Sequence, residues 1–112
     1  MVVKSLSSPF GGQARTRILV ALGLLGSSFP RELSRMLGTP VSAVSRALAG
    51  LERESLVACR LVGRTRVCTL NPAYFAKRQL EAYLTRLSDA DAELRERTSQ
   101  LRRRPRRSGK PL

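Results

Sequence analysis

The sequence predicts a mostly helical α+β domain in which three short helices are followed by a β-hairpin and then by a C-terminal helical segment. Three observations lead to this prediction. Apolar residues first recur at helical spacing, then alternate with polar residues over positions 56–70, and return to helical spacing after Asn71 and Pro72. Glycines and prolines separate these segments. A length of 112 residues is enough for one domain with a modest core.

The first two helices have recognisable ends. Residues 1–12 are rich in turn formers and show no periodic pattern, so we expect a flexible N-terminal arm. A helix should begin near Gln13 and end at residues 26–28, because it carries an apolar stripe made of Ile18, Leu19, Leu22 and Leu25. A shorter helix should begin at Pro30, which suits a first helical position, and stop at Gly38.

The third helix is the first candidate for function. Thr39 offers it an N-cap, and it should run to about Glu54. Its inward stripe is expected to consist of Val41, Val44, Leu48 and Leu51. The opposite face then carries small and basic residues, namely Ser42, Ala43, Ser45, Arg46, Ala49 and Arg53. Small residues let a helix enter the major groove of DNA, where Arg46 can reach a guanine edge or a phosphate. The alternative is an ordinary solvated face.

The hairpin is expected to pair residues 56–62 with residues 65–70 around the two-residue turn Gly63-Arg64. Its basic tip contains Arg64, Thr65 and Arg66, with Arg60 nearby, and can meet phosphates or a minor groove. An exposed turn kept soluble by arginine is the alternative. The same register places Cys59 opposite Cys68, with Cα atoms about 4.5 Å apart. Both a redox-active disulfide and reduced thiols packed as small apolar residues are open, and a reducing cytoplasm favours the thiols.

The C-terminal segment, residues 73–101, is expected to be helical, and a capping-box pattern at Ser88 and Asp91 allows a break in it. Coiled-coil spacing predicts a dimerisation seam made of Leu80, Leu84, Leu87 and Leu94, with Tyr83 beside it. Two-fold pairing would present two copies of the third helix to neighbouring turns of DNA. The alternative is that the segment packs back on its own domain. Residues 102–112 are arginine-rich and are expected to form a disordered basic tail.

The composition favours an anionic partner and excludes several kinds of site. The chain has 21 lysines and arginines against 8 carboxylates, a formal net charge of +13, which attracts polyanions. Histidine is absent, and two cysteines alone cannot close a tetrahedral metal site. We therefore expect no enzymatic activity, no metal, no cofactor and no small-molecule ligand. No apolar run spans a bilayer and no signal peptide is recognisable, so we expect the cytoplasm, at the nucleoid, and no membrane contact.

The ordered motifs resemble those of a known family, the ArsR-like winged helix-turn-helix regulators. The resemblance rests on Arg31-Glu32-Leu33-Ser34-Arg35-Met36-Leu37-Gly38 for the second helix and Val44-Ser45-Arg46-Ala47-Leu48-Ala49-Gly50-Leu51-Glu52 for the recognition helix. It continues in the wing with Val62-Gly63-Arg64-Thr65-Arg66 and then Leu70-Asn71-Pro72. This resemblance implies a winged helix-turn-helix domain over residues 13–72. Metal sensing is not implied, because the second and third helices carry no cysteine, and Cys68 stands where relatives often have an aromatic residue.

Together these features predict a homodimeric, sequence-specific regulator that binds double-stranded DNA and represses transcription. The expected DNA contacts are Thr39, Ser42, Ala43, Ser45, Arg46, Arg53, Arg64, Thr65 and Arg66. One alternative is an architectural protein that binds DNA or RNA without sequence preference, through its net charge. Another is an adaptor that uses the same fold to bind protein. An adaptor would normally lack basic residues on the third helix and the hairpin tip, and both are basic here.

Overall fold

The computed structural model of the chain describes residues 10–103. Within this range the chain forms five helices and three strands in the order α2 (Gln13–Leu25), β1 (Ser27–Ser28), α3 (Pro30–Leu37), α4 (Val41–Arg53), β2 (Val57–Val62), β3 (Thr65–Leu70), α5 (Lys77–Asp89) and α6 (Ala92–Arg103). The strands make one antiparallel sheet in the order β1–β3–β2. The expected α+β class, with helices predominating, is confirmed.

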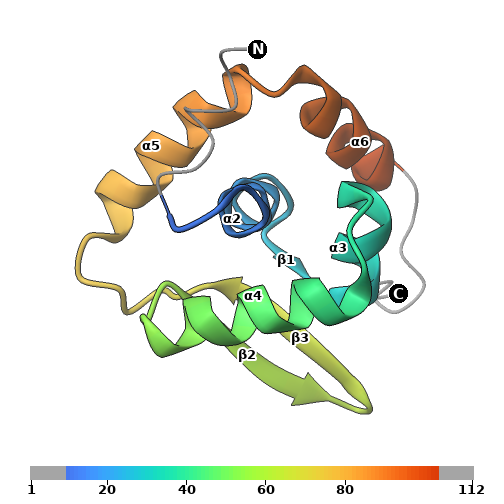
Figure 1. The fold of residues 1–112 in the computed structure, drawn as a ribbon. Helices are drawn as coiled ribbons and strands as arrows, with labels where there is room; N and C mark the ends of the chain where they lie inside the picture. The colour runs from blue at the N-terminus through green and yellow to red at the C-terminus, as the bar shows by residue number, and fades with distance from the viewer. Residues whose placement is uncertain (1–9, 104–112) are drawn as a thin grey trace.

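Helix α2 lies at the centre of the fold, and the other helices and the sheet are arranged around it (Figure 1). Its middle buries five consecutive residues, from Ile18 to Leu22. A surface helix buries only one stripe, so a continuous buried run requires neighbours on every side of the helix. Contacts with α3, α4, α5, α6, β1 and β3 supply them. The core of the described chain is therefore built around α2.

Glycines set the ends of elements where the sequence predicted them. Gly26 follows α2, and its N–H donates to the carbonyl of Leu22 at 2.8 Å. Gly38 ends α3 in the left-handed conformation, with φ 66°, which a residue without Cβ adopts at little cost. Gly63 also has φ 66° and opens the hairpin turn. The strand register follows, with Val62 opposite Thr65, as predicted.

Two features near these elements differ from the prediction. Thr39 does not cap α4: Pro40 holds the N-cap position, and the Thr39 hydroxyl donates back to the carbonyl of Leu37 at 3.4 Å. The link between α3 and α4, residues 38–40, is only three residues long and leaves this side chain at the end of the earlier helix. The second difference is β1, which was not expected and which pairs Ser27 and Ser28 with β3. Two residues are too few to show an alternating pattern.

The C-terminal segment is broken into two helices, α5 and α6. Asp91 caps α6, since its carboxylate accepts the N–H of Leu94 at 3.2 Å, and it also pairs with Arg17 of α2 at 3.0 Å. Ser88, the other half of the proposed capping box, is buried and donates to the carbonyl of Thr85 instead. The turn at this point returns the chain over the central helix, so that α6 contacts both α2 and α3.

The prediction that four leucines of the C-terminal segment form a dimerisation seam is wrong. Leu80, Leu84, Leu87 and Leu94 are at most 9% exposed and belong to the chain's own core. The apolar spacing did identify a buried face, but the turn before α6 folds that face onto its own chain. Of the expected seam residues only Tyr83 stays exposed, at 44%, with its ring 5.8 Å from that of Phe10.

The two predicted termini fall mostly outside the described residues. Phe10 belongs to the expected arm, yet it packs against the core and its carbonyl accepts from Arg15 at 2.7 Å. Arg102 and Arg103, assigned to the disordered tail, instead complete α6. The remaining parts of the arm and the tail, residues 1–9 and 104–112, are not among the described residues.

Replacing Leu84 by alanine should lower the free energy of unfolding by about 2–5 kcal/mol, because it opens a cavity beside α2. It should leave the oligomeric state unchanged. Denaturant unfolding and sedimentation measure the two quantities. Arg86→Ala, an exposed position on the same helix, is the matched control and should change stability by less than about 0.5 kcal/mol. If Leu84→Ala kept the native stability but sedimented as a smaller oligomer, Leu84 would belong to a contact between subunits, as the sequence predicted.

Candidate nucleic-acid interface

Helix α4 turns to solvent the face that the sequence predicted. Val44, Leu48 and Leu51 of the predicted inward stripe are fully buried, whereas Ser42, Arg46 and Arg53 are exposed. Val41, also predicted to face inward, is instead 42% exposed at the first position of the helix. The flanking small residues Ala43, Ser45 and Ala49 are half-buried. The exposed strip of α4 therefore consists mostly of short alanine and serine side chains, from which only the long arginine side chains project. Such a profile suits close approach to a groove.

Basic side chains divide into two groups according to whether a carboxylate of the chain pairs with them. The paired group, within residues 10–101, consists of Arg15, Arg17, Arg66, Lys77, Arg95 and Arg97. In that same range no hydrogen bond or ion pair engages Arg31, Arg35, Arg46, Arg53, Arg60, Arg64, Arg78 and Arg86. The second group retains its full capacity to bind an external anion.

The unpaired arginines are unevenly placed. Arg31 and Arg35 lie on the exposed side of α3, Arg46 and Arg53 on α4, and Arg60 and Arg64 on the β2–β3 hairpin; all six are exposed. Only Arg78 and Arg86 lie elsewhere, on α5. The positive charge that the body of the described chain does not neutralise is thus concentrated on three consecutive segments.

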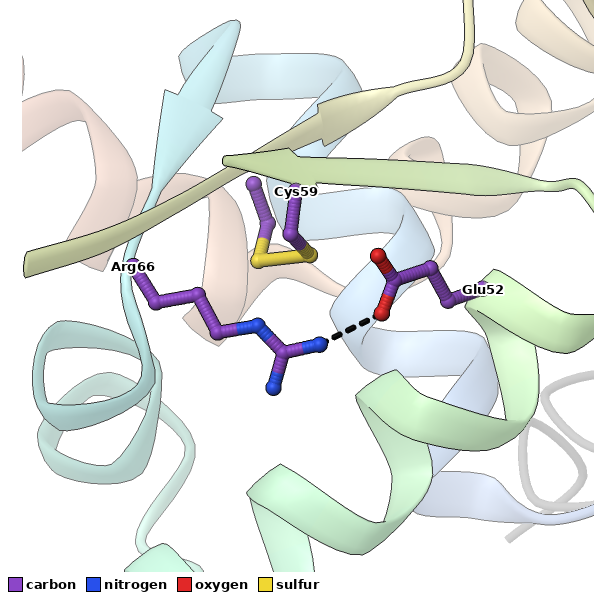
Figure 2. Close-up of a disulfide and its surroundings, with 4 residues drawn as sticks. Glu52, Cys59 and Arg66 are labelled. Carbon is purple, nitrogen blue, oxygen red and sulfur yellow. Dashed lines mark hydrogen bonds and ion pairs between the residues drawn. A yellow bond between two sulfur atoms is a disulfide. The ribbon is translucent and has the colours of Figure 1, made fainter. Parts of the chain in front are cut away.

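The two carboxylates near the C-terminal end of α4 are both neutralised by cations from other elements. Glu52 pairs with Arg66 of β3 across the space between helix and hairpin (Figure 2). Glu54 pairs with Arg15 of α2 at 2.5 Å. Arg66 was expected to contact DNA directly; in the structure it is bound to Glu52 and only partly exposed. Its cation removes a negative charge from the helix that carries Arg46.

A close approach between α2 and α4 helps to fix the orientation of α4. The Arg15 guanidinium lies over Gly50, where a Cβ atom would come within 2.6 Å of Arg15 Nη1. Glycine at this position leaves room for the guanidinium to reach Glu54. No local pattern indicates this contact, because Arg15 and Glu54 are 39 residues apart in the chain.

A disulfide joins the two strands of the hairpin. Cys59 and Cys68 are directly opposite one another, as the predicted register required, and their sulfur atoms are bonded. Of the two states considered for these cysteines, the structure shows the bonded one. Figure 2 shows the disulfide beside the Glu52–Arg66 pair, in the space between hairpin and α4. The side of the hairpin that faces α4 is therefore cross-linked.

The described residues contain no group of three or more cysteines, aspartates and glutamates placed to hold a metal ion. No helix in this part of the chain has the length and apolar character needed to cross a bilayer. A hollow of about 240 Å³ lies between α2, β3 and α5, lined mostly by aliphatic side chains. Comparison of the sequence with protein-family models and with curated proteins finds no match.

Replacing Cys59 and Cys68 together by alanine should lower the free energy of unfolding by about 2–3 kcal/mol, because the cross-link restricts the unfolded chain. Denaturant unfolding with and without a thiol reductant measures the effect. The reductant should destabilise the native protein by a similar amount and leave the double variant unchanged. Equal sensitivity of both proteins to the reductant would show that the disulfide does not stabilise the fold.

Proposed function

We propose that the protein is a winged helix-turn-helix regulator that binds double-stranded DNA. In this proposal α3 and α4 form the helix-turn-helix, α4 is the recognition helix, and the β2–β3 hairpin (residues 57–70) is the wing. The observation that carries the proposal is the placement on α3, α4 and the wing of six exposed arginines that pair with no other described residue. Cations without internal partners attract a polyanion, and the phosphates of a duplex are such a partner.

The two arginines of α4 are assigned different roles. Arg46 lies near the middle of the exposed strip, between small residues, and would enter the major groove deeply enough to reach a guanine edge. Arg53, at the end of the helix, and Arg64, at the wing turn, would bind phosphates on either side. Ser42, Ser45 and the wing residue Thr65 supply shorter hydrogen-bonding groups.

The Glu52–Arg66 pair supports this use of α4. A free carboxylate on the recognition helix would repel the phosphates that Arg46 and Arg53 have to approach. Arg66 cancels that charge and at the same time ties the wing to the helix. Arg66 thus contributes to the interface through Glu52 rather than by contact with DNA, which revises its expected role.

Homodimeric binding and repression by occlusion of a promoter are retained as parts of the proposal. A two-fold arrangement would present two copies of α4 to half-sites about one turn of DNA apart. Because the leucines of α5 and α6 are buried, the contact between subunits would have to use exposed surface, which on α5 includes the ring of Tyr83.

A second candidate function is architectural binding without sequence preference. The formal net charge of +13 favours it, since electrostatic attraction alone gives non-specific affinity. Competition separates the two candidates: a regulator retains one genomic fragment in the presence of excess unrelated DNA at physiological salt, and an architectural protein does not.

Arg46→Ala should weaken binding to a selected genomic fragment by about 1–3 kcal/mol and reduce discrimination at one position of that fragment. Electrophoretic titration against the fragment and its single-base variants measures both effects. The matched control is Arg86→Ala, which removes the same charge from an exposed, unpaired position on α5.

Equal losses from Arg46→Ala and Arg86→Ala would mean that only net charge matters, which supports the architectural alternative. Unchanged binding by Arg46→Ala would remove α4 from the interface altogether.

A further inference from the structure

The tip of the hairpin carries two exposed apolar side chains. Leu61 is 72% exposed and Val62 is 50% exposed, and they are consecutive residues at the end of β2. Single exposed apolar residues are common on protein surfaces, but two in succession at the end of a projecting hairpin give its tip an apolar side chain on each face. Figure 1 shows this end of the hairpin reaching beyond the helices.

The two side chains lie on opposite faces of the ribbon. The Leu61 side chain lies on the same face as those of Val57 and Cys59, and the core covers this face at Val57 and Cys59. The Val62 side chain lies on the other face, with that of Arg60. Residues 60–65, beyond Cys59, are exposed on both faces, although the Arg66 side chain reaches Glu52 of α4. Leu61 is paired with Arg66, whose guanidinium extends to α4, so Leu61 lies on the side of the wing that faces the recognition helix.

We propose that Leu61 and Val62 make an apolar contact in the minor groove of the DNA, next to the major-groove site of α4. This inference rests on the proposed function and deepens it. The choice of DNA as the partner follows from charge, because the unpaired arginines Arg60 and Arg64 flank the two apolar residues. A narrow two-stranded tip matches the narrow minor groove, into which other proteins insert aliphatic side chains.

The two kinds of wing contact have different dependences on salt. Each phosphate neutralised by an arginine releases counterions and adds about 0.9 to the slope of log K against log salt. Burial of an aliphatic side chain releases none, so it shifts log K by the same amount at every salt concentration. The contribution of Leu61 can therefore be separated from that of Arg64.

The test uses the full chain and a short, fluorescently labelled, A·T-rich duplex, with binding followed by anisotropy over a range of salt. Leu61→Thr should weaken binding about tenfold at every salt concentration, with an unchanged slope. Arg64→Ala, the control at the same tip, should lower the slope by about 0.9. Threonine favours strands, and Leu61 is exposed, so the variant should have the native thermal midpoint.

A second arm identifies the groove. Saturating the duplex with a dye that fills A·T minor grooves should abolish the difference between the native protein and Leu61→Thr. A difference that persists with the dye bound overturns the minor-groove assignment, and native-like binding by Leu61→Thr without the dye overturns the apolar contact. A native protein without salt-dependent binding to the duplex overturns the proposed function itself, so the two failures are distinguishable.

Discussion

The burial of α2 on all sides is the constraint on which the rest of the structure depends. A helix with the run Ile18–Leu22 cannot face water on any side of its middle without exposing aliphatic surface. Burying each such side chain stabilises the fold by about 1.5–3 kcal/mol, so the other helices and the sheet have to surround it. Helix α4 takes one of these places with Val44 and Leu48, and the direction of its exposed face follows from that packing.

The distribution of ion pairs is a second consequence of this arrangement. Elements that surround α2 bring their carboxylates near arginines of other elements, as in the pairs Arg15–Glu54 and Arg17–Asp91, which join α2 to α4 and to the start of α6. A surface pair such as Arg15–Glu54, whose Glu54 side chain is 56% exposed, contributes little to stability, yet such pairs decide which cations remain unpaired. The number of arginines is a property of the sequence, but the gathering of most unpaired arginines of residues 10–101 on α3, α4 and the hairpin is a property of the fold.

The sequence predicted those parts of the fold whose signals are local. Helical stripes, the Pro30 and Gly38 helix ends, and the Gly63 turn with its register all depend on residues a few positions apart. An apolar stripe shows that a helix face is buried but not what covers it, and this is why the leucines of α5 were assigned to a second subunit. Likewise, the sequence predicts a DNA contact for Arg66, because nothing local indicates that it pairs with Glu52, which lies on another element. Contacts of this kind depend on tertiary packing and leave no periodic signal.

Two interactions hold the β2–β3 hairpin in a fixed position beside α4. Strand β1 pairs with β3 only at Cys68 and Thr69. The part of the β2–β3 hairpin between residues 60 and 67 is therefore a two-stranded ribbon without a core of its own. Such ribbons are marginally stable in water. Two interactions compensate at the point where the ribbon leaves the sheet: the Cys59–Cys68 disulfide joins its strands, and the Arg66–Glu52 pair joins it to α4. Both lie on the face turned towards the helix, so they hold the ribbon beside α4, while Leu61 and Arg64 at its tip are exposed.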